Sequence, residues 1–245
     1  MHGPATGPRL SRWGTVVMVS AVLVVGGAAA LLIADAASSR ERVVSFAVRG
    51  SLNGVSLDLG DGDVVVAGSG QRAELDVERT DHYAFGHAAE VRRAISGGEL
   101  RIRARCPTTL PHACAVRYRL KVPDNVPVTI RTTGGAVTFS SYRGSARVST
   151  RSGDIDIAAF CGFSLEARAE SGDIDAGAAC PPQELSLRST SGSVHASVPA
   201  GRYRVEAESA SGGRRVHGVA AVSDAPFSIQ ALSSSGDVLV EGRRP

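Results

Sequence analysis

Short segments that alternate apolar and polar residues cover most of the chain from Val44 onward. AELDVER (73–79) and ELRIRAR (99–105) show the period of two that is typical of half-buried β-strands. VSLDLGDGDVVV (55–66) alternates in the same way around a Gly-Asp-Gly-Asp turn. The pattern predicts an all-β protein.

The first part of this region, residues 44–122, is the less regular one. The stretch 80–98 has no clear strand pattern, and we expect a loop there or a short helix across its HAAEVRRA segment. CPTTLPHAC (106–114) is predicted to be a loop because prolines interrupt it. VRYRLKVPDNVPVTIRTTGG (116–135) predicts two strands joined by a Pro-Asp-Asn turn.

Residues 123–242 repeat one unit, made of a short alternating strand, a Ser/Thr-Gly-x turn and a second short strand. Successive turn glycines are separated by 18, 19, 20, 20 and 24 residues. A near-constant period of this length is typical of stacked repeats. The turn residues are Gly135, Gly153, Asp154, Gly172, Asp173, Gly192, Gly212, Gly236 and Asp237.

One repeat unit cannot form a core alone, because it carries few inward apolar residues, such as Val148, Ile155 and Ile157. Laid over its neighbours, each unit buries a continuous aliphatic column, and its strands pair with those above and below. The sequence therefore predicts a β-solenoid, a β-helix-like stack of two-strand repeats of about 20 residues. A β-sandwich with regular hairpins is the alternative.

An uncharged segment precedes the β-region at residues 14–34 and is long enough to span a membrane as a helix. A cleavable signal peptide is the alternative, since Ala34-Asp35-Ala36 resembles a cleavage site, but its apolar core usually has only about 7–15 residues. We expect a single-pass anchor. The domain organisation is then a short cytoplasmic N-terminus (1–13), the anchor (14–34), a linker (35–43) and an extracytoplasmic β-repeat domain (44–245).

The four cysteines follow the repeat. Cys161 and Cys180 each lie eight residues after a turn glycine, so stacking places them one strand spacing apart, about 4.7–4.9 Å. A disulfide needs Cα atoms about 4.4–6.8 Å apart. We therefore expect a Cys161–Cys180 bond and a Cys106–Cys114 bond across the proline-rich loop, with free thiols or a zinc site as alternatives. Disulfides favour a location outside the cytoplasm.

Composition and motifs nominate no chemistry. The net charge of +3 and the absence of basic clusters mixed with aromatics argue against a nucleic-acid partner. Stacked aspartates could bind calcium or act as an acid–base pair, but Gly-Asp also suits a tight turn, which is the interpretation we favour. No G-x-S-x-G, Walker A or strand-anchored GxGxxG motif is present. We predict no catalytic residue, no metal site and no cofactor.

The Val-Pro strand in VRYRLKVPDNVPVTIRTTGGAVTF, followed by the serial turns SGDIDI and SGDVLV, resembles a family of bacterial adhesin-type proteins that carry a domain of unknown function. The resemblance spans roughly residues 44 to 242. It implies a β-helix-like fold, frequent attachment by one membrane segment and no catalytic residues to transfer. Some relatives are linked to envelope-stress sensing, and the long 80–98 stretch and the four cysteines depart from the family pattern.

We therefore expect a single-pass bacterial membrane protein that binds or scaffolds at the cell envelope without catalysis. Its partners would be the membrane and an envelope protein or glycan. The alternatives are a membrane-anchored envelope-stress sensor or regulator and, third, a polysaccharide-active enzyme on a β-helix.

Overall fold

The computed structural model describes residues 39–107 and 114–244, which form strands and connecting loops. No helix in these two ranges is long and apolar enough to cross a membrane, and the predicted anchor at 14–34 lies outside them. The strands are β1 (Arg40–Arg49), β2 (Gly54–Gly68), β3 (Glu74–Tyr83), β4 (Glu90–Ser96), β5 (Glu99–Arg105), β6 (Cys114–Val122), β7 (Val128–Gly134), β8 (Val137–Ser140), β9 (Ala146–Ser152), β10 (Ile155–Phe160), β11 (Ser164–Ser171), β12 (Ile174–Ala178), β13 (Glu184–Ser191), β14 (Val194–Pro199), β15 (Arg202–Ser209), β16 (Arg214–His217), β17 (Ala220–Ala221), β18 (Ser228–Ser235) and β19 (Val238–Arg243).

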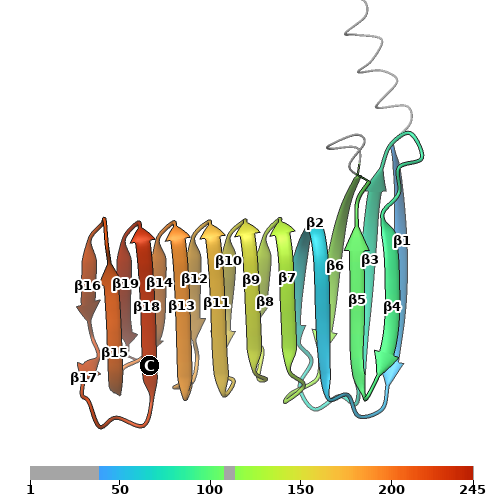
Figure 1. Cartoon of the computed structure of the whole chain (residues 1–245). Helices are drawn as coiled ribbons and strands as arrows, with labels where there is room; N and C mark the ends of the chain where they lie inside the picture. The colour runs from blue at the N-terminus through green and yellow to red at the C-terminus, as the bar shows by residue number, and fades with distance from the viewer. Residues whose placement is uncertain (1–38, 108–113, 245) are drawn as a thin grey trace, which may run out of the picture.

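The strands form two facing sheets, which lie one in front of the other in Figure 1. The front sheet has the order β4-β5-β2-β7-β9-β11-β13-β18-β15. The back sheet has the order β1-β3-β6-β2-β8-β10-β12-β14-β19-β16. Long β2 belongs to both because it turns the corner between them near Asp61. One strand of the front sheet, the corner and the following strand of the back sheet make one coil, and this arrangement confirms the predicted solenoid-like stack.

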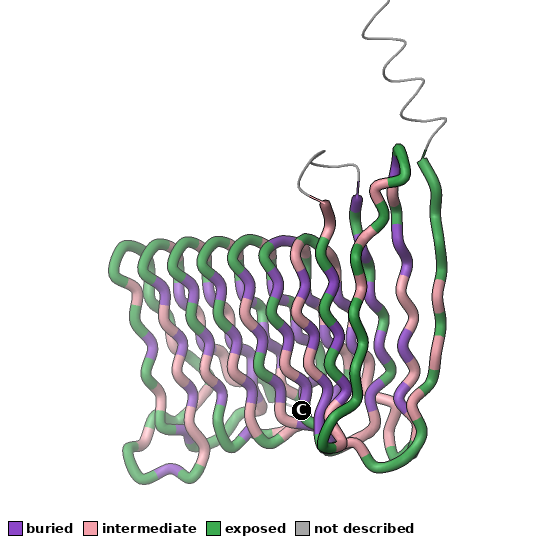
Figure 2. Tube along the Cα trace, turned by 45° about the vertical axis from the view of Figure 1, so that its right-hand side comes forward, coloured by how far each residue is buried: buried purple, intermediate pink, exposed green. Residues whose placement is uncertain are grey.

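Parallel pairing in register explains why each coil needs its neighbours. Every second side chain points between the sheets, as the alternating burial in Figure 2 shows. Burying one such aliphatic side chain contributes about 1.5–3 kcal/mol, so the core is the sum over all coils. The central inward row of the front sheet consists of Leu57, Ile130, Val148, Ala167, Leu187, Ala231 and Ala207, all buried.

Buried tyrosines complete the core where aliphatic side chains leave space. Tyr142 packs edge-on against Phe139, with ring centroids 5.5 Å apart, and its hydroxyl donates to the carbonyl of Val126. Burial raises the pKa of Tyr118 to about 12, outweighing the opposite effect of nearby Arg79. These hydroxyls therefore stay protonated and neutral in the folded protein at neutral pH.

Two coils stack in an order that differs from their order in the chain. The coil of β18 and β19 lies between β13–β14 and β15–β16, so Gly236 neighbours Gly192, and Gly212 lies beyond it. The 24-residue step from Gly212 to Gly236 supplies the connection, because β17 and the loop after it bring the chain back by one coil. The regular repeat predicts the coils but not this exchange.

The end of the stack near β1 and β4 is antiparallel. Of the loop or short helix expected across residues 80–98, the helix is wrong and the loop is only residues 84–89, because Glu90–Ser96 is strand β4, paired antiparallel with β5. Gly97 and Gly98, with φ of 60° and 76°, make the tight turn that joins the two strands. Strand β1 begins at Arg40, inside the expected linker 35–43, and pairs antiparallel with β3, whereas residues 35–38 lie outside the described residues.

Candidate binding surface

A row of stacked glycines forms the corner between the two sheets. Gly153, Gly172 and Gly192 have φ of 137°, 138° and 151°, a region that favours glycine. A Cβ on Gly172 would lie only 2.4 Å from the carbonyl oxygen of Gly153 in the next coil. Gly135 and Gly236 share these properties, whereas Gly212 lies outside the left-handed region yet still abuts the Gly236 carbonyl. The corner is therefore as narrow as a backbone allows.

Aspartates along this corner bind the neighbouring coil. The Oδ1 atom of Asp154 accepts a hydrogen bond from the backbone N–H of Asp173 at 2.9 Å, and that of Asp173 from Ser193 at 2.7 Å. Asp237 repeats the contact with the N–H of Gly213 at 2.7 Å. The aspartates thus stabilise the stack itself, and they bind the backbone of the next coil rather than that of their own turn.

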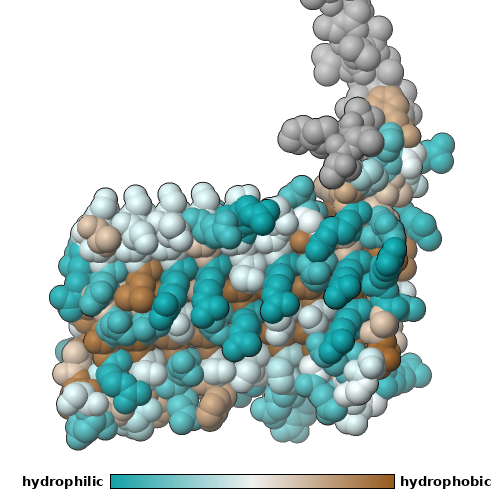
Figure 3. Space-filling model, in the orientation of Figure 1, coloured by the Kyte–Doolittle hydropathy of each residue, from teal (hydrophilic) through white to brown (hydrophobic). Residues whose placement is uncertain are grey.

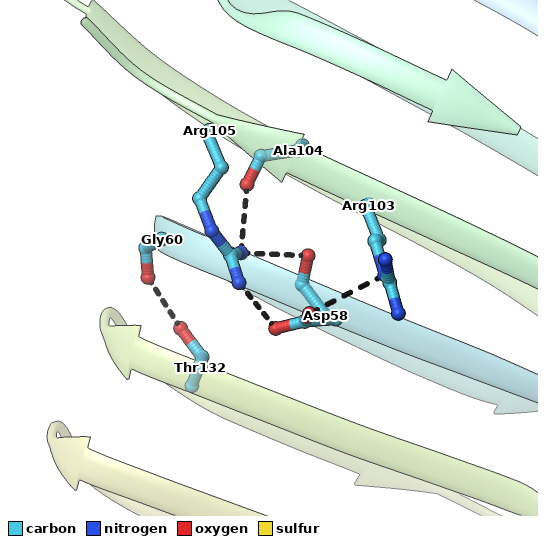
Figure 4. Close-up of polar contacts among 6 residues, drawn as sticks. All are labelled: Asp58, Gly60, Arg103, Ala104, Arg105 and Thr132. Atoms are coloured by element: carbon cyan, nitrogen blue, oxygen red, sulfur yellow. Dashed lines mark hydrogen bonds and ion pairs between the residues drawn. The ribbon is translucent and has the colours of Figure 1, made fainter.

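Buried hydroxyls reinforce the same corner from inside. Ser189, Ser233 and Ser209 each donate to the carbonyl oxygen of a glycine in the adjacent coil, at 2.9, 2.8 and 2.7 Å. Thr132 donates in the same way to Gly60 at 3.1 Å (Figure 4). With its polar backbone groups satisfied between coils, the corner presents a rigid edge.

The outer face of the front sheet carries long polar side chains in rows that cross the strands (Figure 3). Most of its arginines are neutralised by carboxylates. Asp58 binds Arg105 at 2.7 Å and Arg103 at 3.7 Å (Figure 4), and Glu166 binds Arg168 at 2.5 Å. These exposed pairs contribute little stability, but they fix the positions of the side chains.

Arg188, like Arg131 and Arg204 on the same face, is not among these ion pairs. Its Nε and Nη2 atoms donate to the side-chain oxygen of Gln230 at 3.1 and 2.5 Å, and it forms no ion pair with any carboxylate of the described ranges. Gln230 in turn donates to Glu206 at 2.6 Å. The guanidinium of Arg188 is therefore held in place by a neutral partner and keeps its positive charge available.

A groove of about 570 Å³ runs past Arg188 on this face, just below the corner. It crosses five adjacent coils, from β9 through β11, β13 and β18 to β15, a span of about 19 Å at ~4.8 Å per strand. Its lining carries hydroxyl groups and side chains of both charges. The lining side chains that stand out from the sheet are Ser149, Arg168, Glu170, Arg188, Thr190, Glu208, Leu232 and Ser234.

The outer face of the back sheet is built differently. Asp175 lies 3.2 Å from His195 Nδ1, and Glu241 lies 3.5 Å from the other ring nitrogen. Even so, no group of three or more His, Cys, Asp or Glu side chains within 39–107 and 114–244 is arranged to hold a metal ion. This face is charged, and a cavity of about 440 Å³ lies over its strands β1, β3 and β6.

Both disulfides are present, with the pairing that the repeat predicts. Cys161 and Cys180 bridge adjacent coils with Cα atoms 4.8 Å apart, and Cys106 and Cys114 close the loop between β5 and β6 at 5.7 Å. The sequence did not single out Arg168 and Arg188. Their signal was available, because each lies four residues before a turn glycine and they are 20 residues apart, one repeat period.

Comparison with known proteins finds one matching family model and several solved structures of similar fold. The family model described as Toastrack DUF4097 matches residues 125–241. A solved structure described as "a putative cell adhesion protein" from Clostridium sporogenes ATCC 15579 aligns with a TM-score of 0.50 at 13% identity, covering 83% of this chain and 100% of its own. A "putative adhesin" from Bacteroides fragilis NCTC 9343 aligns with a TM-score of 0.44 at 9% identity, covering 82% and 97%. Curated proteins give no match. The resemblance to an adhesin-type family of unknown function is thereby confirmed, and the structural likeness shows a shared fold.

Proposed function

We propose, from the premise that residues 125–241 form a Toastrack domain, that the protein is a non-enzymatic binding protein of the adhesin type at the bacterial cell envelope. The front-sheet groove is its binding surface. The observation that carries the proposal is Arg188, a charged donor held by neutral Gln230 in a groove that crosses five coils. The description of the Clostridium sporogenes structure as a cell adhesion protein agrees with this function.

The groove suits an extended ligand better than a small molecule. It is open and crosses five strands, with hydroxyls and both signs of charge along it, whereas small-molecule pockets are concave and enclose most of the ligand. Thr190 and Ser234 supply donors and acceptors beside Arg188, at a spacing set by the strands. A linear envelope glycan would contact several coils at once, which adds weak contacts together without any moving part.

An extracytoplasmic location follows from the same proposal. Two disulfides persist only in an oxidising compartment, which supports a domain outside the cytoplasm. We propose that the uncharged segment 14–34 anchors it there.

The proposal is tested by cosedimentation of the detergent-solubilised full chain with isolated bacterial cell walls. Arg188→Ala removes the available guanidinium, and we expect the apparent Kd to rise about tenfold, as loss of one charged hydrogen bond does. Arg215→Ala is the matched control, because Arg215 is exposed on the back sheet.

Equal binding by the two variants would show that the groove is not the binding surface. Release of reducing sugar from the walls by the wild-type chain would show that the protein is an enzyme instead.

A further inference from the structure

The end of the stack formed by β1 and β4 leaves the edges of both sheets open. In Figure 1 these strands lie at the right-hand end, and Figure 2 turns that end toward the viewer. β1 pairs only with β3, and β4 only with β5, among the strands of residues 39–107 and 114–244. Ten residues of β1 and seven of β4 thus present an outer edge able to accept another strand.

This end is also the apolar one. Val44, Phe46 and Val48 point between the sheets but stay only partly buried, and Ile95 of β4 is 57% exposed. The opposite end is better protected, because β17 covers the start of β15. Along the rest of β15, the outward side chains are Arg204, Glu206 and Glu208, which disfavour edge-to-edge pairing.

We propose that a second copy of this chain pairs with β1 in antiparallel orientation, about a twofold axis at Ser45. In this register Glu41 lies opposite Arg49 of the second copy, on the outer face. By symmetry, Arg49 lies opposite Glu41 of the second copy, so the pair occurs twice. Val44 lies opposite Phe46 of the second copy, on the inner face, so the apolar residues cover one another. The complementarity of β1 with itself rests on these two pairs, since the register also places Arg42 opposite Val48, and Arg49 contacts Glu74 of its own chain at 3.3 Å as well.

Other registers lack the Glu41–Arg49 pair. Two side chains that face each other across the paired strands must lie on the same side of the sheet. The twofold axis must therefore pass through a residue of β1, and the nearest other registers place it at Val44 or at Phe46. An axis at Val44 places Glu41 opposite Ala47 and Arg42 opposite Phe46. An axis at Phe46 moves Glu41 beyond the paired strand and places Val43 opposite Arg49.

The same twofold axis would pass through Ser45 of the back sheet and Arg93 of the front sheet. In the back sheet, Ser45 is the register partner of Glu78, Glu78 that of Arg119, and Arg119 that of Val65 of β2. In the front sheet, Arg93 is the register partner of Ile102, and Ile102 that of Leu57 of β2. Val65 and Leu57 lie at equal distances along β2 from the corner at Asp61. Ser45 and Arg93 are therefore at the same height in the two sheets.

The contact between β1 and β4 agrees with that height, since the guanidinium of Arg93 lies 4.1 Å from the centre of the Phe46 ring. The second copy thus extends the front sheet through β4 while it extends the back sheet through β1. The covered end measures about 34 Å along β1 and about 24 Å along β4, each over about 10 Å of sheet thickness, or about 600 Å² from each copy. This area is at the lower end of the range for specific interfaces, whose standard size is about 800 Å² per partner.

Oxidative crosslinking of the full chain in detergent tests the register. All four cysteines are held in disulfides, so Ser45→Cys introduces a single free thiol directly on the proposed axis. We expect most of this variant to run as a covalent dimer on non-reducing gels. Glu206→Cys, on the free edge of β15, is the control and stays monomeric.

A dimer formed by Glu206→Cys, or none by either variant, would overturn the proposal. A charge exchange tests it separately by sedimentation equilibrium. Glu41→Arg and Arg49→Glu each place like charges opposite one another, and we expect each to weaken the dimer about tenfold. The double variant restores the pair and brings the dissociation constant back to within about threefold of wild type. Single variants that associate like wild type would also contradict the proposal.

Discussion

Gly172 shows how a single residue sets the shape of the whole corner. Its φ of 138° strains any side chain, and a Cβ would meet the carbonyl of Gly153 at 2.4 Å. Gly70 has a φ of 71°, but no atom lies within 4 Å of the position that a Cβ would take there. A side chain at Gly70 would therefore meet backbone strain alone, whereas one at Gly172 would meet both strain and steric overlap.

Gly172→Ala is expected to destabilise the protein by at least about 2 kcal/mol, because strain and overlap add. Gly70→Ala introduces backbone strain without overlap and should lower the free energy of unfolding by about 1 kcal/mol. Urea unfolding followed by circular dichroism measures both. Equal losses of unfolding free energy would show that close stacking at the corner does not limit the residue at 172.

The turn aspartates show how much of a contact can be predicted from residue type alone. A Gly-Asp pair predicted turn chemistry, and the carboxylates of Asp154 and Asp173 do serve the corner. That each accepts from the following coil could not be predicted, because a local turn and a contact between coils use the same residues. Stacking geometry decides between them.

At the scale of elements, periodicity predicted the regular strands well and the irregular ones poorly. Each repeat strand alternates because one face is buried, so its sequence shows a period of two. β4 was missed because its inward positions are Val91, Arg93 and Ile95 at an open end of the stack. A strand that buries little loses the pattern that would reveal it.

The Cys161–Cys180 bond joins the segments that follow β10 and β12 across adjacent coils. Closing a loop of 19 residues restricts the unfolded chain, so Cys161→Ser with Cys180→Ser should lower the free energy of unfolding by about 3 kcal/mol. Peptide mapping without reductant must first show both thiols blocked in the wild-type chain. Alkylation of either thiol there would refute the bond.

At the scale of the molecule, the repeat predicted a stack but not the order of its coils. The turns at Gly192, Gly212 and Gly236 have nearly the same sequence, so no coil carries a mark of its position. The order is set instead by the long connection from β16 through β17 to β18, whose path is not a property of any one repeat.

Engineered cysteines can measure that order. Ser191 is in register with Ser235 on adjacent strands, so Ser191→Cys with Ser235→Cys should form a disulfide. Ser191→Cys with Ser211→Cys is the control, because those coils are two strand spacings apart, about 9.6 Å. A bond in the control and none in the first pair would mean that the coils follow chain order.

This exchange of coils has a consequence for biosynthesis. During synthesis β15 and β16 emerge before β18 and β19, so the stack has a vacant internal place until residues 228–243 arrive. Ordinary tandem repeats can add one coil after another, each protected as it is laid down. Here completion is a single late event, and a chain interrupted before it leaves part of the interior exposed to solvent and to proteases.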